Sequence, residues 1–434
     1  MVAKVCKVMF DDNLVGALQY IEDRPAAAFE YSPEWIRDGF SLAPIHLPLR
    51  PGVFTFPNLS YETYKGLPAI FSDSLPDDFG NAIIDSWQAR KGLDATEFKP
   101  IDRLLYTGKR GMGALEYQPT IQLGKEKSFE VDLAELVWLS QKVLTHREEF
   151  TASLEDDDSM TALLQIGTSA GGARPKAVIA INKDRTKVLS GQVDAPEGFE
   201  HYLIKFDGIR EKDRSKQTFG DPVGYGVMEF VYYLMAKDCG IDMQPCELFE
   251  ENGRRHFMTK RFDRVENQKY HCATLCAIDH ADYKKPGHYS YEQLLGVMRK
   301  IKLTYSEQEQ IFRRMVFNVI ARNQDDHTKN FSFLVNDDFQ WQLAPAYDVA
   351  FSYDPASDWV NLHQMSINAK RDGFNMEDLL TVARLITNLT PAKTKEIIEQ
   401  TKESVGNWQQ LARQHNVPKW LIDKAAAAHR LDLK

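Results

Sequence analysis

Two side chains near residue 325 have the types and the spacing that phosphoryl transfer requires. Asp325 and Asn330, in QDDHTKN (324–330), are separated by four residues, which is the Asp-x-x-x-x-Asn spacing of kinase catalytic loops. Transfer of a γ-phosphoryl group needs a carboxylate that orients the acceptor hydroxyl, and oxygen ligands for Mg²⁺. We therefore expect Asp325 to be the catalytic carboxylate and Asn330 to bind a metal ion.

A second metal ligand should follow, because one Asn cannot neutralise phosphates through Mg²⁺, a hard cation that prefers oxygen ligands. FSFLV (331–335) reads as a strand, and Asp348 comes directly after WQLAPAY (341–347). A hairpin from 331 to 347 would bring Asp348 back beside Asn330. Asp and Asn also serve ordinary turns, but their order between a helix and a hairpin favours a metal-binding centre.

The other polar residues of this loop are less decisive. His327 could touch a phosphate, and we keep it as a candidate nucleotide contact. A histidine that only shapes the loop is nevertheless the favoured interpretation. The spacing assigns no role to Asp326.

A glycine-rich stretch, GTSAGGARPKAVIAI (167–181), could form a phosphate-binding loop ahead of a strand. Glycine permits positive φ and lets backbone N–H groups approach phosphate oxygens closely. No Gly-Lys-Ser/Thr opens a helix here, so it is not a Walker A loop, and an ordinary tight hairpin explains it equally well. Ser169 places a nucleophilic hydroxyl where a phosphate would lie. The candidate phosphate contacts are Gly171, Gly172, Ala173 and Lys176.

Lys205, in HYLIKF (201–206), could present a charge to nucleotide phosphates. In kinases such a lysine is oriented by a glutamate from a nearby helix, and Glu229 is the candidate. Both side chains could equally extend their charged ends to solvent. The run RFDR (261–264) fits a hinge between lobes. Arg261 and Phe262 of this run, and Lys260 before it, are further candidate nucleotide contacts, with Phe262 placed against adenine.

The chain divides into three parts by its residue patterns. An α+β module is expected over 1–125, a strand-rich nucleotide-binding lobe over 126–265 and a helical catalytic lobe over 266–434. Such an order of a strand-rich lobe and a helical lobe is typical of kinase-like proteins. The expected strands are 5–10, 28–31, 177–181, 201–206, 246–250 and 256–262.

Capping signals set the limits of the main helices. A helix is expected over 222–239, with Asp221 as its cap, Pro222 in its first turn and Gly240 at its end. Ser306 and Glu309 have the spacing of a capping box ahead of a helix over 306–322. A further apolar pattern from Leu133 predicts a helix between the first two parts.

The composition is that of a globular protein, with 43% hydrophobic and 26% charged residues. A net charge of −9 opposes tight, unassisted binding to DNA. No apolar run is long enough to span a bilayer. Five cysteines in 434 residues do not form a disulfide framework. We expect a cytoplasmic protein that binds no membrane.

Several motifs in the same order resemble the HipA-type serine/threonine kinase toxins of bacterial toxin–antitoxin modules. The similarity extends over nearly the whole chain. The motifs are FEYSPEW (29–35), DSLPDDFGN (73–81), RLLYTGKRGMGAL (103–115), SAGGARPK (169–176), RFDR (261–264), DDHTKNFSF (325–333) and APAYDV (344–349).

The resemblance implies a two-lobed kinase distantly similar to the phosphoinositide kinases, using ATP and Mg²⁺. It implies Asp325 as catalytic aspartate, Asn330 and Asp348 as Mg²⁺ ligands, and Lys205 on the phosphates. Ser169 would be autophosphorylated, which ejects its loop and silences the enzyme. The implied substrate is an aminoacyl-tRNA synthetase, and the implied partner is a helix-turn-helix antitoxin that carries the toxin to DNA. The alternatives are a kinase of small molecules or lipids, and a degenerate kinase that serves only as a co-repressor.

The sequence departs from the family pattern in a few places. Asp326 stands where some members have glycine, and Arg174-Pro175 replaces a Gln-Glu pair. The segment HCATLCAIDH (271–280) replaces a more acidic stretch, so the substrate site is expected to differ. Its His271, Cys272, Cys276 and His280 lack the usual spacing of zinc ligands, which favours buried cysteines and capping histidines. The basic stretch 210–216 would be the activation segment or a solvated loop.

Overall fold

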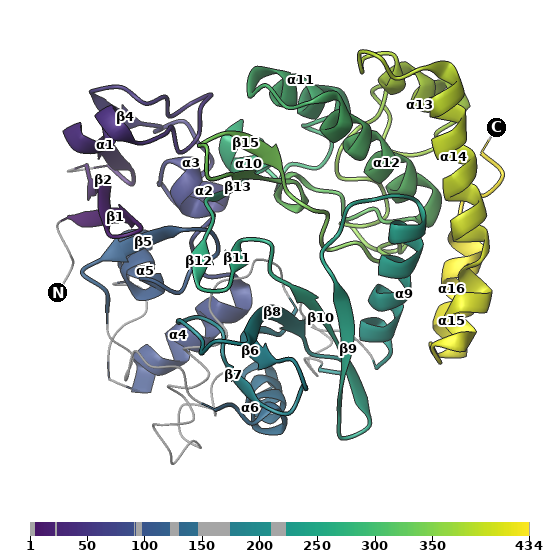
Figure 1. The fold of residues 1–434 in the computed structure, drawn as a ribbon, viewed down its shortest axis with the longest axis horizontal. Helices are drawn as coiled ribbons and strands as arrows, with labels where there is room; N and C mark the ends of the chain where they lie inside the picture. The colour runs from purple at the N-terminus through teal and green to yellow at the C-terminus, as the bar shows by residue number, and fades with distance from the viewer. Residues whose placement is uncertain are drawn as a thin grey trace. The chain divides into compact units, whose positions relative to one another are not determined.

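The computed structural model describes most of the chain, and its residues cluster into two compact units (Figure 1). The described residues are 5–21, 24–90, 92, 98–121, 130–145, 174–209 and 223–433. Unit 1 comprises residues 1–42, 47–226 and 247–272, and unit 2 comprises residues 43–46, 227–246 and 273–434. Both units mix helices and strands, which confirms the α+β class. Among the described residues, no helix is long and apolar enough to cross a membrane.

The first sheet of unit 1 is antiparallel and has the order β4-β3-β2-β1-β5. Two of its strands were predicted and are confirmed as β1 (Cys6–Phe10) and β3 (Ala27–Tyr31). The sequence analysis missed β2 (Asn13–Tyr20), which pairs with both of them. The other elements of this part are β4 (Val53–Thr55), β5 (Leu115–Gln118), α1 (Pro33–Asp38), α2 (Tyr61–Tyr64), α3 (Ala69–Ser72), α4 (Asp78–Arg90) and α5 (Pro100–Thr107).

The second sheet of unit 1 has the order β7-β6-β8-β10-β9. The four strands predicted between residues 177 and 262 are all confirmed, with ends shifted by one or two residues. Every residue of β6 except the last is buried, as the continuous apolar run AVIAI requires. The strands are β6 (Lys176–Asn182), β7 (Val188–Ser190), β8 (Phe199–Lys205), β9 (Cys246–Glu251) and β10 (Arg254–Lys260), followed by the short pair β11 (Arg264–Val265) and β12 (Gln268–Lys269).

One apolar core joins the second sheet to three helices of unit 1. The predicted helix after Leu133 is confirmed as α6 (Leu133–Thr145), and its Val137 is fully buried. Ile83 of α4 and Tyr106 of α5 belong to the same cluster as Ile179 of β6. This sheet face is therefore covered by helices, which fixes the ends of β6 and β8 where the candidate lysines lie.

Unit 2 is mainly helical, as the sequence predicted for residues 266–434. Figure 1 shows α12 and α14 side by side, and the two helices are in contact. The chain forms a three-stranded sheet of order β13-β14-β15 ahead of the last helices. The elements are α9 (Tyr225–Asp238), β13 (Cys272–Thr274), α10 (Leu275–Ile278), α11 (Tyr291–Lys300), α12 (Tyr305–Ala321), η2 (Thr328–Asn330), β14 (Ser332–Val335), β15 (Trp341–Leu343), α13 (Met376–Ala383), α14 (Pro391–Gly406), α15 (Trp408–Gln414) and α16 (Lys419–Ala428).

The predicted capping box of α12 is wrong by two residues. Thr304, not Ser306, is the N-cap, and its side chain accepts a hydrogen bond from the Glu307 backbone N–H. Glu307 returns the contact to the Thr304 backbone N–H at 2.7 Å. Glu309 instead pairs with Arg313 one turn further on, at 2.8 Å. Both positions have the Ser/Thr-x-x-Glu pattern, so the pattern alone does not choose between them.

The helix predicted over 222–239 is α9, and its expected stop is confirmed. Gly240 has a φ of 72°, the left-handed conformation that commonly ends helices. A Cβ atom there would lie 3.1 Å from the Arg313 guanidinium. The proposed cap residues Asp221 and Pro222 lie outside the described residues.

We expect the buried His271 to make the stability of unit 1 dependent on pH. Its Nε2 lies 3.0 Å from the Leu42 carbonyl oxygen, and burial lowers the pKa of His271 from 6.5 to about 4. The folded-state pKa lies below the unfolded one, so this group's stabilising contribution is complete above pH 6.5 and disappears as the pH falls towards 4. We expect a loss of about 3 kcal/mol of unfolding free energy over that window, at 1.36 kcal/mol per pKa unit. Urea unfolding at several pH values measures it.

The matched variant is His271→Gln, whose amide can still donate to Leu42 but does not titrate. It should lose less unfolding free energy than the wild type between pH 6.5 and pH 4. An equal loss in both proteins would contradict the assignment of this pH dependence to His271.

Candidate active site

The predicted catalytic loop follows α12 directly. Arg322 caps the helix in the left-handed conformation, with φ 57° and ψ 42°, and so turns the chain out of the helix. Ser352 pairs with the start of this loop through its backbone. Its N–H donates to the Arg322 carbonyl oxygen, and its carbonyl oxygen accepts from the Gln324 N–H, each at 3.1 Å. The loop then closes with η2 and enters β14. Backbone pairing therefore ties residues 322–324 to the segment that follows Asp348.

Asp325 is the exposed member of two adjacent aspartates. Its side chain is 35% exposed, whereas that of Asp326 is fully buried. Asp325 Oδ1 accepts a 2.7 Å hydrogen bond from Trp359 Nε1, and His327 Nε2 lies 3.8 Å from the same oxygen. A carboxylate that is held by one oxygen and accessible to solvent can receive an acceptor hydroxyl on the other. This geometry suits the predicted catalytic role.

Asp326, to which the sequence assigned no role, is a buried anchor of the loop. Its Oδ2 accepts hydrogen bonds from Tyr291 Oη at 2.8 Å and from His363 Nδ1 at 2.9 Å. Its Oδ1 accepts from the Gln364 backbone N–H at 2.7 Å. Tyr291 in turn accepts from Asn318 Nδ2 on α12 at 3.0 Å. A buried carboxylate with three donors is well satisfied, and it fixes the loop against α11 and α12.

Asn330 and His327 use their side chains differently. Asn330 Nδ2 donates to the Asp325 carbonyl oxygen at 2.7 Å, which directs the amide nitrogen into the loop and makes Oδ1 the atom suited to a metal ion. His327 is the N-cap of η2, and its Nδ1 accepts from the Lys329 backbone N–H at 3.2 Å. His327 thus has the loop-shaping role that was favoured, and its contact with a nucleotide stays a prediction.

The predicted hairpin is confirmed as β14 and β15, which pair from Val335 with Trp341 to Phe333 with Leu343. Asp348 follows with a φ of 55°, a conformation that Asp adopts more readily than most residues. Asn330 and Asp348 line the same small cavity. The hairpin has therefore brought the two proposed metal ligands to one place, as the sequence predicted.

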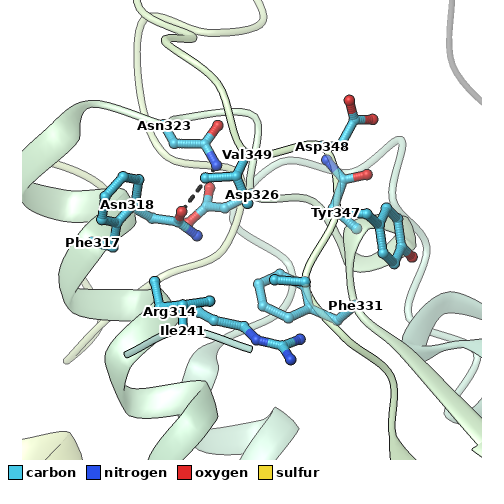
Figure 2. A pocket seen from close by; sticks show the side chains of 12 residues that line it. Ile241, Arg314, Phe317, Asn318, Asn323, Asp326, Phe331, Tyr347, Asp348 and Val349 are labelled. Carbon is cyan, nitrogen blue, oxygen red and sulfur yellow. Dashed lines mark hydrogen bonds between the residues drawn. The ribbon is translucent and has the colours of Figure 1, made fainter. Parts of the chain in front are cut away.

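This cavity is too small to be the nucleotide site. Its volume of about 20 Å³ has room for about one water molecule, whereas ligand pockets measure several hundred cubic ångströms. Figure 2 shows the Asp348 carboxylate pointing away from Arg314 and Asn318, which line the same cavity. The Asp348 carboxylate is therefore directed to the side opposite these two residues.

Arg314, which the sequence analysis missed, supports this turn from α12. It is 5% exposed, and its Nη2 donates to the Ala344 carbonyl oxygen at 2.7 Å. Burial lowers the pKa of Arg314 to about 10. Its Nε and Nη1 have no partner among the protein atoms of the described residues. A water molecule in the cavity would satisfy them.

The donor set fits Mg²⁺. Asp348 offers two carboxylate oxygens and Asn330 one amide oxygen, and Mg²⁺ prefers oxygen ligands and keeps several waters in such sites. Neither sulfur nor imidazole belongs to the set. A bound Mg²⁺ would neutralise the phosphate charge that develops during transfer.

Two lysines lie directly opposite each other on neighbouring strands of the second sheet of unit 1. Lys205, at the end of β8, is opposite Lys176 on β6 and opposite Phe257 on β10. Directly opposite residues share one face of a sheet, and like charges placed so repel each other. Lys176 and Lys205 are only 3% and 9% exposed. Their positive charges therefore require anions nearby, which suits the prediction that both contact phosphates.

One such anion is Asp77, from the motif DSLPDDFGN. Its Oδ2 lies 3.2 Å from Lys176 Nζ, and both side chains are almost fully buried. Its Oδ1 accepts from the Gly80 N–H at 2.7 Å in the first turn of α4. Asp77 thus links α4 to the strand that follows the glycine-rich stretch. The contact of Lys176 with a nucleotide stays a prediction.

Asp77→Asn should destabilise unit 1 by about 3 kcal/mol, since breaking a buried ion pair leaves an uncompensated charge. Asn keeps the oxygen that accepts from Gly80, so the helix start is preserved. Guanidinium unfolding of the purified chain measures the change. The double variant Asp77→Asn, Lys176→Met should recover most of the lost stability. Additive losses in the double variant would contradict a direct pair.

Lys260 and Arg261, the other basic candidates, have partners within unit 1. Lys260 Nζ pairs with Glu200 at 2.5 Å on the neighbouring strand. Arg261 is 3% exposed and its Nε donates to Asp263 at 2.8 Å. Burial would raise the pKa of Asp263, but the adjoining guanidinium of Arg261 holds it well below its usual range. The contacts of Lys260, Arg261 and Phe262 with a nucleotide stay predictions.

The run RFDR also forms hydrogen bonds with the RLLYTGKRGMGAL motif. Gly113 N–H donates to Asp263 Oδ2 at 2.7 Å. Arg264 donates to the carbonyl oxygens of Gly113 and Gly111, at 2.8 and 3.1 Å. Burial lowers the pKa of Arg264 to about 9. Two motifs that the sequence analysis left without a joint role therefore hold each other in place.

Several predicted residues lie outside the described part of the chain. Glu229 is described, and it is 1% exposed on α9 in unit 2. Lys205 belongs to unit 1, so the proposed pair of Glu229 with Lys205 stays a prediction. The residues outside the described part are Ser169, Gly171, Gly172, Ala173 and the basic stretch 210–216.

The zinc alternative finds no support in the described residues, among which no three His, Cys, Asp or Glu side chains are arranged to hold a metal ion. Cys276 is fully buried, and all five cysteines are free, as expected. His280 stacks on His46 with ring centroids 3.8 Å apart. The predicted buried cysteine is therefore confirmed for Cys276, whereas the buried His271 contacts the Leu42 carbonyl oxygen and caps no described helix.

Two models of known protein families match this chain. Residues 168–408, more than half of the chain, match the family described as HipA-like C-terminal domain, and residues 6–118 match the HipA N-terminal domain. A protein of Sinorhizobium fredii named "Putative kinase Y4mE" is 24% identical over 369 residues, covering 80% of this chain and 77% of that protein. A Haemophilus influenzae protein named "Putative kinase" is 32% identical over 199 residues, covering 42% and 52%.

Comparison with solved structures supports the two-lobed kinase-like fold. The HipA chain from the Shewanella oneidensis complex of HipA, HipB and operator DNA superposes with a TM-score of 0.66. The match covers 97% of this chain and 93% of that one, at 16% sequence identity. Because the family match extends over more than half of the sequence, the chain belongs to the HipA family of kinases.

Proposed function

We propose that this protein is a Mg²⁺-ATP-dependent protein serine/threonine kinase that acts as the toxin of a toxin–antitoxin pair. The observation that carries the proposal is the arrangement of Asp325, Asn330 and Asp348 on one loop and one hairpin. The first is a carboxylate with an accessible oxygen, and the other two line one cavity. The relatives named as kinases support this chemistry.

In the proposed reaction, Asp325 orients the acceptor hydroxyl and takes its proton as the new oxygen–phosphorus bond forms. The bond from the γ-phosphorus to the bridging oxygen breaks, and ADP leaves with that oxygen. Asn330 and Asp348 hold the metal ion that neutralises the phosphates. The proposed role of Lys205 is contact with phosphates.

The biological role is proposed from the family relationship and from charge. The related Shewanella chain was solved with HipB and operator DNA. We propose that a helix-turn-helix antitoxin likewise carries this chain to DNA, since a net charge of −9 disfavours direct binding. The proposed substrate is an aminoacyl-tRNA synthetase, whose phosphorylation arrests growth. The proposed self-inhibition is autophosphorylation of Ser169.

Incubation of the full chain with γ-labelled ATP, Mg²⁺ and cell extract tests the kinase proposal. We expect labelled protein bands that require the wild-type chain and are absent when Mg²⁺ is removed by chelation. Label in small molecules or lipids alone would replace the proposal with the alternative kinase class. No label in any fraction, with Ser169 shown to be unmodified by mass spectrometry, would favour a degenerate kinase that serves as a co-repressor.

A further inference from the structure

One segment, residues 357–364, supplies hydrogen-bond donors to both aspartates of the catalytic loop. Trp359 Nε1 donates to Asp325 Oδ1 at 2.7 Å. His363 Nδ1 and the Gln364 N–H bind Asp326 at 2.9 and 2.7 Å. The exposed aspartate thus receives one donor from this segment, whereas the buried one receives two.

Trp359 is itself held in place by its own segment. Its backbone N–H donates to Ser357 Oγ at 3.1 Å, and the N–H of Val360 donates to the same oxygen at 3.2 Å. Its carbonyl oxygen accepts from Gln364 Nε2. His327 lies close to the indole, with ring centroids 6.1 Å apart. The indole N–H is therefore presented to Asp325 from a fixed position.

A fixed donor matters because the partly exposed carboxylate of Asp325 needs a partner to set its orientation. The terminal torsion of an aspartate is broad and roughly two-fold, so its two oxygens exchange easily. Asp325 is 35% exposed and is not held by packing in the way that Asp326 is. A donor on Oδ1 engages that oxygen and leaves Oδ2 to the acceptor hydroxyl. Small misplacements of a reacting group cost large factors in rate.

We propose that Trp359 is a positioning residue, whose indole N–H orients the Asp325 carboxylate so that Oδ2 faces the acceptor hydroxyl. This inference rests on the proposed kinase function of Asp325. It assigns a function to a residue that no spacing in the sequence indicated. The indole acts through Asp325, whose Oδ1 accepts its hydrogen bond.

Trp359→Phe tests this role because it keeps the aromatic ring and removes the donor. We expect kcat to fall about 10- to 100-fold, the range that one hydrogen bond to a charged group supports. KM for ATP and the thermal unfolding midpoint should stay at their wild-type values. The matched control is Trp420→Phe, which alters a 47% exposed indole on α16 and should leave kcat unchanged.

Two results would overturn the proposal. One is a wild-type kcat in Trp359→Phe. The other is a fall in kcat accompanied by an equal disturbance of KM for ATP and of the unfolding midpoint, since that pattern belongs to a merely structural tryptophan.

A spectroscopic readout separates this proposal from the kinase proposal. In a ¹H–¹⁵N spectrum of the full chain, the Trp359 indole signal is identified by its loss in Trp359→Phe. It should shift on Asp325→Ala and not on Asp338→Asn, an aspartate in the exposed turn between β14 and β15. If the indole signal does not shift on Asp325→Ala, the contact between Trp359 and Asp325 is refuted. If the indole signal shifts on Asp325→Ala but the wild-type chain phosphorylates nothing, the contact is real and the kinase proposal is refuted.

Discussion

Replacing Asp325 by Asn should lower the rate of phosphoryl transfer by about 10³-fold, within the range that general acid–base groups contribute. An amide cannot take the proton of the acceptor hydroxyl. Asn can still accept the 2.7 Å hydrogen bond from Trp359 Nε1 through its own Oδ1, so the loop keeps its support. The buried Asp326 is untouched. The rate falls for a chemical reason, and the measurement is label transfer from ATP to protein in a single-turnover assay.

The control for this variant is Asp338→Asn, which makes the same chemical change in the exposed β14–β15 turn. It should transfer label at the wild-type rate. Both variants should unfold at the wild-type temperature, because neither removes a buried contact. If Asp325→Asn keeps more than about a tenth of the wild-type rate, Asp325 is not the general base.

Replacing Asp348 by Asn should raise the Mg²⁺ concentration needed for half-maximal activity by at least about tenfold, since even the outer partners of metal ligands contribute 10- to 100-fold to affinity. The variant loses one negative charge and one carboxylate oxygen. It should not disturb the backbone, because Asn also tolerates the φ of 55° observed at this position. The rate at saturating Mg²⁺ should be affected much less than the half-saturation point.

Titration of activity with Mg²⁺ at fixed ATP separates this effect from a loss of the base. Mn²⁺, which accepts nitrogen and oxygen ligands, should restore more activity to Asp348→Asn than to Asp325→Asn. Asp338→Asn again serves as the control and should leave the Mg²⁺ titration unchanged. An unaltered half-saturation point in Asp348→Asn would remove Asp348 from the metal site.

Local patterns in the sequence were sufficient for the catalytic loop and the hairpin. Asp325, Asn330 and Asp348 lie within one helix-loop-hairpin unit, whose geometry depends on contacts between near neighbours in the chain. The continuous apolar run of β6 likewise predicted a buried strand. Such features are encoded by side-chain periodicity and by spacing. Fold class and family could therefore be predicted from the sequence.

The α12 cap shows where local patterns stop being sufficient. Thr304 and Ser306 each precede a Glu by three residues, and two capping boxes are chemically equivalent at that level. The folded chain uses the first, because Glu309 pairs with Arg313 and Tyr305 is already helical. The N-terminal boundary of α12 therefore depends on the side-chain contacts of Glu307 and Glu309 in the folded chain.

The sequence by itself determined the residue types proposed for the reaction: a carboxylate, an amide and a second carboxylate at fixed intervals. Only the tertiary structure decided what holds them. Trp359 reaches Asp325 across 34 residues, and Gly113 binds Asp263 across 150. Asp77 and Lys176 meet although they belong to different motifs. Such pairs arise when whole helices, strands and loops pack together. No short spacing in the sequence encodes them, so only the tertiary structure shows which residues hold the candidate site in place.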